Sequence, residues 1–202
     1  AEQETEGAVD VARKRIFSAL LPAKPLGSAS KRITKGESPK WQGFTYQDVG
    51  PLFIRSENVL WGKLDLSEPM RISEEFHAKL ERSRVHAGDV LINLVGASIG
   101  RACAVPKGIG EANINQAVAV ITPASELDAE YLAQFLISPQ AQEVLHSGKV
   151  DTARANISLC DLRELCVPLP PLSEQRRIVA ELDALQAEVD RLKALQAETA
   201  AE

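Results

Sequence analysis

Apolar positions near the N-terminus repeat with a helical period. Between residues 8 and 21, side chains such as Val9 and Ile16 share one helical face, and Pro22 ends the pattern. The next stretch, residues 25–44, is rich in Gly, Ser, Pro and Lys and shows no period. We therefore expect a short helix that packs on another element, followed by irregular loops of the kind that often carry function.

From residue 52 the pattern becomes that of strands, in short segments bounded by Gly, Pro or Asn. The segments are LFIRSENV, GDVLINLVG, RACAV and NQAVAVITP. The second segment is nearly all apolar from Asp89 to Val95, which predicts a strand buried on both faces.

After Pro123 the period turns helical. The sequence predicts one helix around Tyr131 and Phe135, a second over residues 139–146 capped by Ser138, and a third over residues 159–165. Ser158 and Asp161 form the S-x-x-D pattern of a capping box at the start of the third helix. Because strands precede helices, we predict an α+β fold with a mixed or antiparallel twisted sheet, not a βαβ nucleotide fold.

The segment VPLPPLSEQ predicts a rigid hinge, since clustered prolines cannot continue a helix. A new helix is expected after it, with Ser173 as the cap. Its apolar residues follow the 4-3 spacing of a coiled-coil seam: Ile178, Leu182, Leu185, Val189 and Leu192. The alternative is one amphipathic helix that lies on its own domain. We accordingly divide the chain into an N-terminal helical segment (1–22), a globular domain (23–170) and a long C-terminal coiled-coil helix (171–202).

The net charge of −5 argues at first against a nucleic-acid partner. The acidic excess lies in the tails, because residues 21–160 carry 15 basic and 15 acidic side chains. Residues 24–63 carry seven basic and three acidic side chains, so one part of the domain is locally basic. This balance fits phosphate contact but also fits an ordinary solvated surface.

Cysteine and histidine spacing gives no metal signature. Cys103, Cys160 and Cys166 form no CxxC pair, and the three histidines are far apart, so we expect reduced thiols and no zinc site. No apolar run approaches the roughly 20 residues that a bilayer requires. These features predict a cytoplasmic protein without a membrane partner.

The strongest catalytic pattern is Gly96-Ala97-Ser98-Ile99-Gly100, which matches the G-x-S-x-G nucleophile elbow. An elbow needs a helix directly after the serine, whereas RACAV predicts a strand. A tight hairpin turn is the simpler interpretation. The sequence also lacks a phosphate-binding loop and an adenine-methyltransferase tetrapeptide, so we expect no catalysis by this chain.

The segment LCVPLPPLSEQRRIVAELDALQAEVDRLKALQ resembles the conserved region of type I restriction-modification specificity subunits. The upstream segments PLGSASKRITKGESP, FIRSENVLWGKL, HAGDVLINLVGASIGRACAVP and NINQAVAVI are similar to the recognition domain of that family, and GKVDTARANISLCDLRELCVPLPP to its closing segment. The resemblance covers about residues 25–196 in the family's order.

The resemblance implies a non-catalytic subunit with two recognition domains held apart by antiparallel helices, each reading half of a split DNA site. Its expected partners are double-stranded DNA, methyltransferase subunits that methylate adenine, and a restriction subunit. ATP, S-adenosylmethionine and Mg²⁺ would be bound by those partner subunits, and no cofactor by this chain. Since this sequence has one domain and one full helix, either a second half belongs to it or two copies pair through the coiled coil.

Candidate DNA contacts follow from side-chain chemistry. Cations in the expected basic loop are candidates for phosphate contact: Lys31, Arg32, Lys35 and Lys40. Polar side chains at expected loop tips are candidates for base edges: Arg55, Asn58, Lys63, Ser98, Arg101, Arg154 and Asn156. Gln116 could also read a base, or could satisfy buried backbone groups.

Two other functions stay open at this point. The chain could be the recognition portion of a fused restriction-methylation enzyme, or a coiled-coil interaction protein without a DNA role. Catalytic motifs beyond either terminus would favour the first of these. Unchanged duplex binding after loss of Lys31, Lys35 and Arg101 would favour the second.

Overall fold

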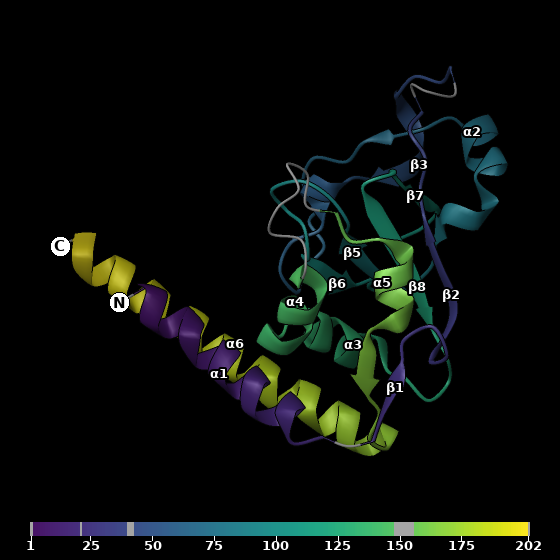
Figure 1. The fold of residues 1–202 in the computed structure, drawn as a ribbon. Helices are drawn as coiled ribbons and strands as arrows, with labels where there is room; N and C mark the ends of the chain where they lie inside the picture. Colours follow the sequence, from purple (N-terminus) through teal and green to yellow (C-terminus); the bar gives the residue numbers. More distant parts are fainter. Residues whose placement is uncertain (1, 21, 40–42, 148–155, 202) are drawn as a thin grey trace.

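The computed structural model describes residues 2–20, 22–39, 43–147 and 156–201. A globular domain of sheets and short helices stands at one end of a long pair of helices (Figure 1). The helices are α1 (Glu2–Ser18), α2 (Glu74–Lys79), α3 (Ala129–Leu136), α4 (Pro139–His146), α5 (Leu159–Glu164) and α6 (Leu172–Ala201), with short 3-10 turns η2 (Ser56–Asn58) and η3 (Glu81–Ser83). The strands are β1 (Ala23–Pro25), β2 (Ser30–Lys35), β3 (Gln47–Ile54), β4 (Arg84–Val85), β5 (Val90–Asn93), β6 (Ala102–Ala104), β7 (Ala112–Ile114), β8 (Val118–Pro123) and β9 (Cys166–Pro168).

The strands form a mixed, mainly antiparallel arrangement, which confirms the predicted α+β class. A four-stranded antiparallel sheet has the order β2-β8-β5-β6, and a three-stranded sheet has the order β3-β7-β4. Within the second sheet β3 and β7 run parallel, with Ile54 beside Ile114. The β1–β9 pair joins the start of the domain to its end.

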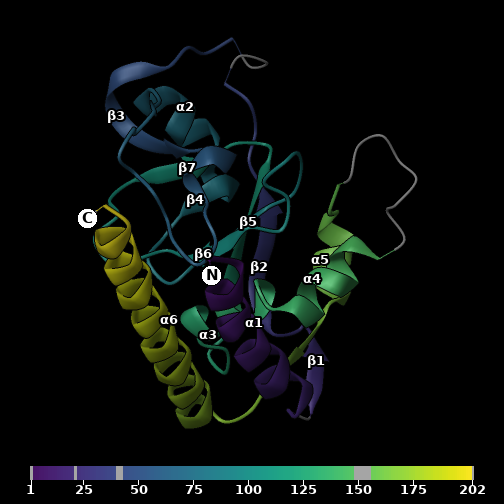
Figure 2. The ribbon, with the colours of Figure 1, turned by 90° about the vertical axis from the view of Figure 1, so that its left-hand side faces the viewer.

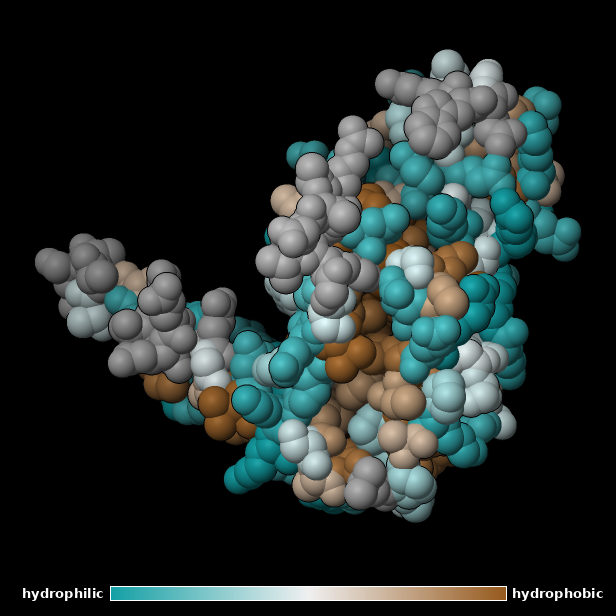
Figure 3. Space-filling model, viewed as in Figure 1, coloured by the Kyte–Doolittle hydropathy of each residue, from teal (hydrophilic) through white to brown (hydrophobic). Residues whose placement is uncertain are grey.

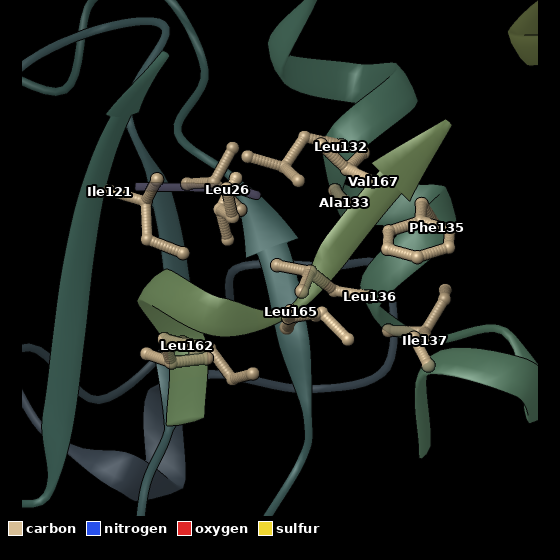
Figure 4. Close-up of a cluster of buried hydrophobic side chains, with 14 of the residues drawn as sticks. Leu26, Ile121, Leu132, Ala133, Phe135, Leu136, Ile137, Leu162, Leu165 and Val167 are labelled. Carbon is tan, nitrogen blue, oxygen red and sulfur yellow. The ribbon is translucent and has the colours of Figure 1, made fainter. Parts of the chain in front are cut away.

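The main core lies between the four-stranded sheet and the helices α3, α4 and α5. Its central side chains are fully or almost fully buried (Figure 4): Leu26, Ile121, Leu132, Leu136, Leu162, Leu165 and Val167. The strand β5 is buried on both faces, as its apolar run predicts, because its opposite face packs in a second cluster with Val85 and Val120. Burial of this many apolar side chains is the main stabilising contribution to the domain.

The short helices after Pro123 begin where their local signals predict. Ser138 accepts a hydrogen bond from the Ala141 N–H and caps α4, whose first residue is Pro139. At α5, Asp161 N–H donates to Ser158 Oγ (3.1 Å) and Ser158 N–H donates to Asp161 Oδ2 (2.7 Å), which is a complete capping box.

Three predictions about local structure are wrong. Residues 25–44 are not irregular throughout, because β2 runs through them; its single buried apolar residue, Ile33, hid the strand pattern. The segment LFIRSENV is not one strand, because β3 ends at Ile54 and η2 follows. Ser173 does not cap α6, because the helix begins at Leu172 and the Glu174 and Gln175 N–H groups donate to the Pro171 carbonyl.

The partner of α6 is α1 of the same chain. The two helices run antiparallel beside each other, and α3 lies between this pair and the sheets (Figures 1 and 2). Arg15 Nη2 on α1 lies 3.9 Å from Glu181 Oε1 on α6. The Phe17 ring packs 5.5 Å from the Tyr131 ring and anchors α1 to α3. The pairing supports the coiled-coil prediction over a lone helix on the domain surface.

Only part of the predicted seam faces α1 and the domain. Ile178, Leu182 and Val189 are buried, whereas Leu185 is 39% and Leu192 38% exposed. Val11 on α1 and Leu195 on α6 are also exposed, and the space-filling view shows exposed apolar side chains on the helix pair (Figure 3). That Leu185 and Leu192 belong to a partner-binding seam stays a prediction.

Candidate nucleic-acid interface

Strand ends from both sheets meet at one edge of the domain. Asn115 N–H, after β7, donates to the Ile54 carbonyl at the end of β3 (2.9 Å). Leu94 N–H, after β5, donates to the Ala117 carbonyl (2.8 Å), and Gly36 N–H, after β2, donates to the Val118 carbonyl (3.4 Å). These bonds bring segments far apart in sequence side by side.

We call this surface the recognition edge. It consists of Lys35–Gly36, Arg55–Ser56, Val95–Arg101, Asn115–Gln116 and Asn156. Its described residues include three basic side chains and no carboxylate, and Glu57 lies directly beyond it, 3.5 Å from Arg55 Nη1. Cations beside amide and hydroxyl groups are the side chains that contact phosphates and base edges of DNA.

The G-x-S-x-G segment forms the turn between β5 and β6. Gly96 (φ +81°) and Gly100 (φ +84°) have backbone conformations that other residues rarely adopt. The turn leads into strand β6, not into a helix, so it has the wrong geometry for a nucleophile elbow. Ser98 is half-buried, and its carbonyl accepts the Arg101 N–H. The turn therefore presents Ser98 and Arg101 together.

Two of the predicted site residues lie at the end of β3. Arg55 is half-buried and directly precedes η2, and its Nε finds no partner among the described residues. Asn58 is not at an exposed loop tip, because only 6% of it is exposed. Its Oδ1 accepts the Arg55 N–H and its Nδ2 donates to the Asp65 carbonyl, both at 2.9 Å. The expectation of a free Asn58 amide is wrong, and the residue instead fixes the turn that presents Arg55.

Three of the cations expected in a flexible loop, Lys31, Arg32 and Lys35, lie on strand β2 instead. Arg32 is held in place: its Nη2 donates to Asp89 Oδ2 and to the Arg84 carbonyl, both at 2.9 Å. Since Asp89 is 2% exposed, this ion pair is internal to the fold. Lys31 and Lys35 are exposed, and Lys35 lies at the end of β2 that joins the recognition edge. Arg32 is thus committed to structure, while Lys35 can face a partner.

The remaining candidates are spread around the same edge. Asn156 is exposed and forms an isolated bridge with Val95, which places it beside the β5–β6 turn. Lys63 is exposed on a neighbouring turn. Lys40 and Arg154 lie outside the described residues.

Gln116 lies at the middle of the edge. The side chain that satisfies backbone in this turn is Asn115, whose Oδ1 accepts the Ala117 N–H (3.1 Å). Gln116 itself is exposed, so it does not satisfy buried backbone groups. Its position could not be read from the sequence, because two adjacent amides in one turn have the same local signal.

Ionisation near the edge follows from local contacts. The Ser67 N–H holds the pKa of Asp65 below its ordinary value, and the Ser67 hydroxyl and Lys63 add to this effect. Asp65 therefore remains a carboxylate close to Lys63. Away from the edge, burial raises the pKa of the Cys103 thiol to about 12, which makes it an inert core residue.

The described residues include no group of three or more His, Cys, Asp or Glu side chains placed to bind a metal ion. Among the described helices, none has the length and apolar character to span a bilayer.

Known proteins resemble the chain over most of its length. The model of the type I restriction modification DNA specificity domain matches residues 29–199. The type I restriction enzyme EcoBI specificity subunit of Escherichia coli is 36% identical over 141 residues, which is 69% of this chain and 29% of that subunit.

Solved structures show the same fold. The HsdS subunit from Thermoanaerobacter tengcongensis matches with a TM-score of 0.72 and 28% identity, over 100% of this chain and 48% of that one. A chain solved in work on complex assembly and conformational transition of the type I R-M system matches with a TM-score of 0.75 and 27% identity, over 100% of this chain and 49% of that one. The chain thus spans about half the length of these solved chains and less of the curated relative. A match over this range, with the same fold, shows that the chain belongs to the family of type I restriction-modification DNA specificity domains.

Proposed function

We propose that this chain recognises one half of a bipartite DNA target for a type I restriction-modification complex. The observation that carries the proposal is the recognition edge, where the backbone segments that carry Lys35, Arg55 and Arg101 lie beside those of Gln116 and Asn156. Cations position the duplex through its phosphates, and amides or guanidinium groups read base edges in the major groove.

The helix pair fits the role of a spacer between two half-sites. As a helix of 30 residues, α6 is about 45 Å long, against about 34 to 36 Å for one turn of DNA. Exposed apolar residues of the helix pair, among them Leu185, Leu192 and Leu195 of α6, would contact a second recognition half or a second copy of the chain. The same helices and the proline hinge would dock the methyltransferase subunits.

In this proposal the chain supplies sequence choice and no catalysis. Adenine methylation and cleavage belong to the methyltransferase and restriction subunits, which would also bind S-adenosylmethionine, ATP and Mg²⁺. The complex works where its DNA is, which places it in the cytoplasm.

The decisive experiment maps methylation. The chain is co-expressed with a cognate methyltransferase subunit in a host without adenine methylation, and modified adenines are located across the genome. We expect a split motif whose one half depends on this domain. No new methylation together with no co-purifying methyltransferase would contradict the proposal.

A second experiment tests the edge itself through the salt dependence of duplex binding. Each lost phosphate contact should lower the slope of log K against log salt by about 0.9. The variant Lys35→Ala/Arg55→Ala/Arg101→Ala should therefore lose roughly 2 to 3 units of slope. Lys107→Ala is the matched control, because Lys107 is exposed in the turn at the opposite end of β6. Equal slopes for the unaltered chain, the triple variant and Lys107→Ala would exclude the recognition edge as the phosphate-binding surface.

A further inference from the structure

Trp61 is an exposed aromatic side chain at the tip of a tight turn. Val59 and Leu64 pair in an isolated antiparallel bridge, and Leu60 N–H donates to the Lys63 carbonyl (2.9 Å). Gly62 closes the turn with φ +71°. The indole is 53% exposed, although tryptophan is a residue whose burial stabilises a fold strongly.

The turn that carries Trp61 is fixed on both sides. Asp65 N–H donates to the Asn58 carbonyl (2.8 Å), and Gly62 N–H donates to the Ala102 carbonyl on β6 (2.9 Å). Val59 at the base of the turn is fully buried. Because the backbone is already ordered, a partner that contacts the indole does not have to order this loop.

The turn also lies beside the recognition edge. Asn93 Nδ2, at the end of β5, donates to the Ser56 carbonyl (2.9 Å) and to the Val59 carbonyl (3.3 Å). This amide ties the Trp61 turn to the strand end that leads into Val95 and Ser98. On its other side the turn contacts Ala102, the residue after Arg101.

The surroundings of Trp61 favour an anionic partner with apolar surface beside its charges. Lys63 is exposed on the same turn, and Arg101 is half-buried directly before strand β6. Duplex DNA presents phosphates next to deoxyribose and base edges, which matches an indole with two cations nearby. Tryptophan also gives the strongest stacking and cation contacts among side chains.

We propose that Trp61 contacts duplex DNA, packing its indole on deoxyribose and the apolar part of a base edge at the margin of the half-site, while Lys63 and Arg101 take the adjacent phosphates. This inference rests on the proposed function and adds an apolar contact to it. The contact contributes affinity that does not depend on counterion release, and so it differs in kind from the contacts of Lys35 and Arg55.

The test uses the complex of the full chain with its methyltransferase subunit and a fluorescein-labelled duplex that carries the mapped target. Dissociation constants are measured by anisotropy from about 50 to 200 mM salt. Trp61→Ala should weaken binding roughly 5- to 30-fold at every salt concentration, as expected when burial of the exposed part of a large apolar side chain is lost, and should leave the slope unchanged. Trp61→Phe keeps a ring and should restore most of the affinity.

Two further variants separate the apolar contact from charge. Lys63→Ala should lower the slope by about 0.9. Trp61→Lys should bind more weakly than the unaltered chain; tighter binding with a steeper slope would mean that the turn meets only phosphate. Val144→Ala removes an exposed apolar side chain from α4 and should change nothing.

The outcomes distinguish this inference from the proposed function. If Trp61→Ala binds as tightly as the unaltered chain while the triple edge variant loses slope, the indole contact is refuted and DNA recognition stands. If the unaltered complex binds no duplex, both proposals fall.

Discussion

Gln175 joins the hinge to the domain, and its loss should destabilise the chain more than any change on the outer face of α6. The side chain is fully buried, accepts the Asp128 N–H, and donates to the carbonyls of Glu126 and Pro170, each at 2.8 Å. It is the last residue of the segment VPLPPLSEQ, which the sequence predicts to be a hinge. Three elements are thus fixed by one amide: the start of α6, the proline hinge and the loop that opens α3.

The size of the effect follows from the three hydrogen bonds. A net contribution of about 0.5 to 1.5 kcal/mol each gives roughly 3 kcal/mol for Gln175→Ala. Because Glu126 is exposed, water can replace part of its lost bond, and we expect a decrease of about 2 to 3 kcal/mol in the free energy of unfolding. With a urea dependence of about 2 kcal/mol per molar, the midpoint should fall by more than about 1 M.

The assay is urea unfolding followed by circular dichroism. Gln196→Ala on the exposed part of α6 is the control, and it should stay within about 0.5 kcal/mol of the unaltered chain. If Gln175→Ala is no more destabilising than this control, the hinge is not held by the amide and the reasoning is wrong.

Five more substitutions test the packing and the charge of one side chain. In Gly36→Ala the new Cβ would lie 1.7 Å from the Ile114 carbonyl oxygen, so we expect more than about 3 kcal/mol of destabilisation or insoluble protein. Gly7→Ala on α1 places its Cβ in open space and should stabilise the chain by up to about 1 kcal/mol. Thermal unfolding measures both effects. Leu182→Ala should lower the free energy of unfolding by about 2 to 5 kcal/mol, and Leu185→Ala should lower it clearly less because Leu185 is partly exposed. Equal decreases in urea unfolding would show that Leu185 is as buried as Leu182. Loss of hydration raises the pKa of Glu130, and Asp183 and Asp128 add to the rise, so its charge opposes folding above that pKa. Glu130→Gln should therefore raise the melting temperature at pH 7, with a gain that shrinks as the pH falls toward 4, and a gain that is independent of pH would contradict this cause.

The elements that sequence predicted best are those specified by neighbouring residues. The capping box of Ser158 and Asp161 and the Ser138-Pro139 start of α4 each depend on side chains within one helical turn, so no distant contact could alter them. By contrast, β2 has a single buried apolar residue and becomes a strand only because β8 pairs with it about 90 residues later. Such pairing leaves no periodic signal in the sequence.

The sequence indicated the candidate site residues by their chemical type, and the structure shows which of them are exposed and which are bonded within the fold. Asn58 and Gln116 are both amides in expected turns, yet Asn58 is buried and bonded to backbone while Gln116 is exposed. Arg32 and Lys35 lie on one strand, and only Arg32 meets a buried carboxylate, Asp89. Trp61 was missed because an aromatic residue in an apolar segment predicts a core position.

Because α6 is long, a small change of angle at the hinge moves its far end by a large distance. The residues of α6 that follow Gln175 reach about 39 Å beyond this anchor. A tilt of roughly 5° at the anchor would move the far end by about 3.4 Å, the rise of one base pair along a DNA strand. In the proposed function, the spacing between two half-sites would then depend on the angle that the Gln175 amide and the buried Ile178 and Leu182 give to α6, and a loosened hinge would accept targets with a spacer one base pair longer or shorter.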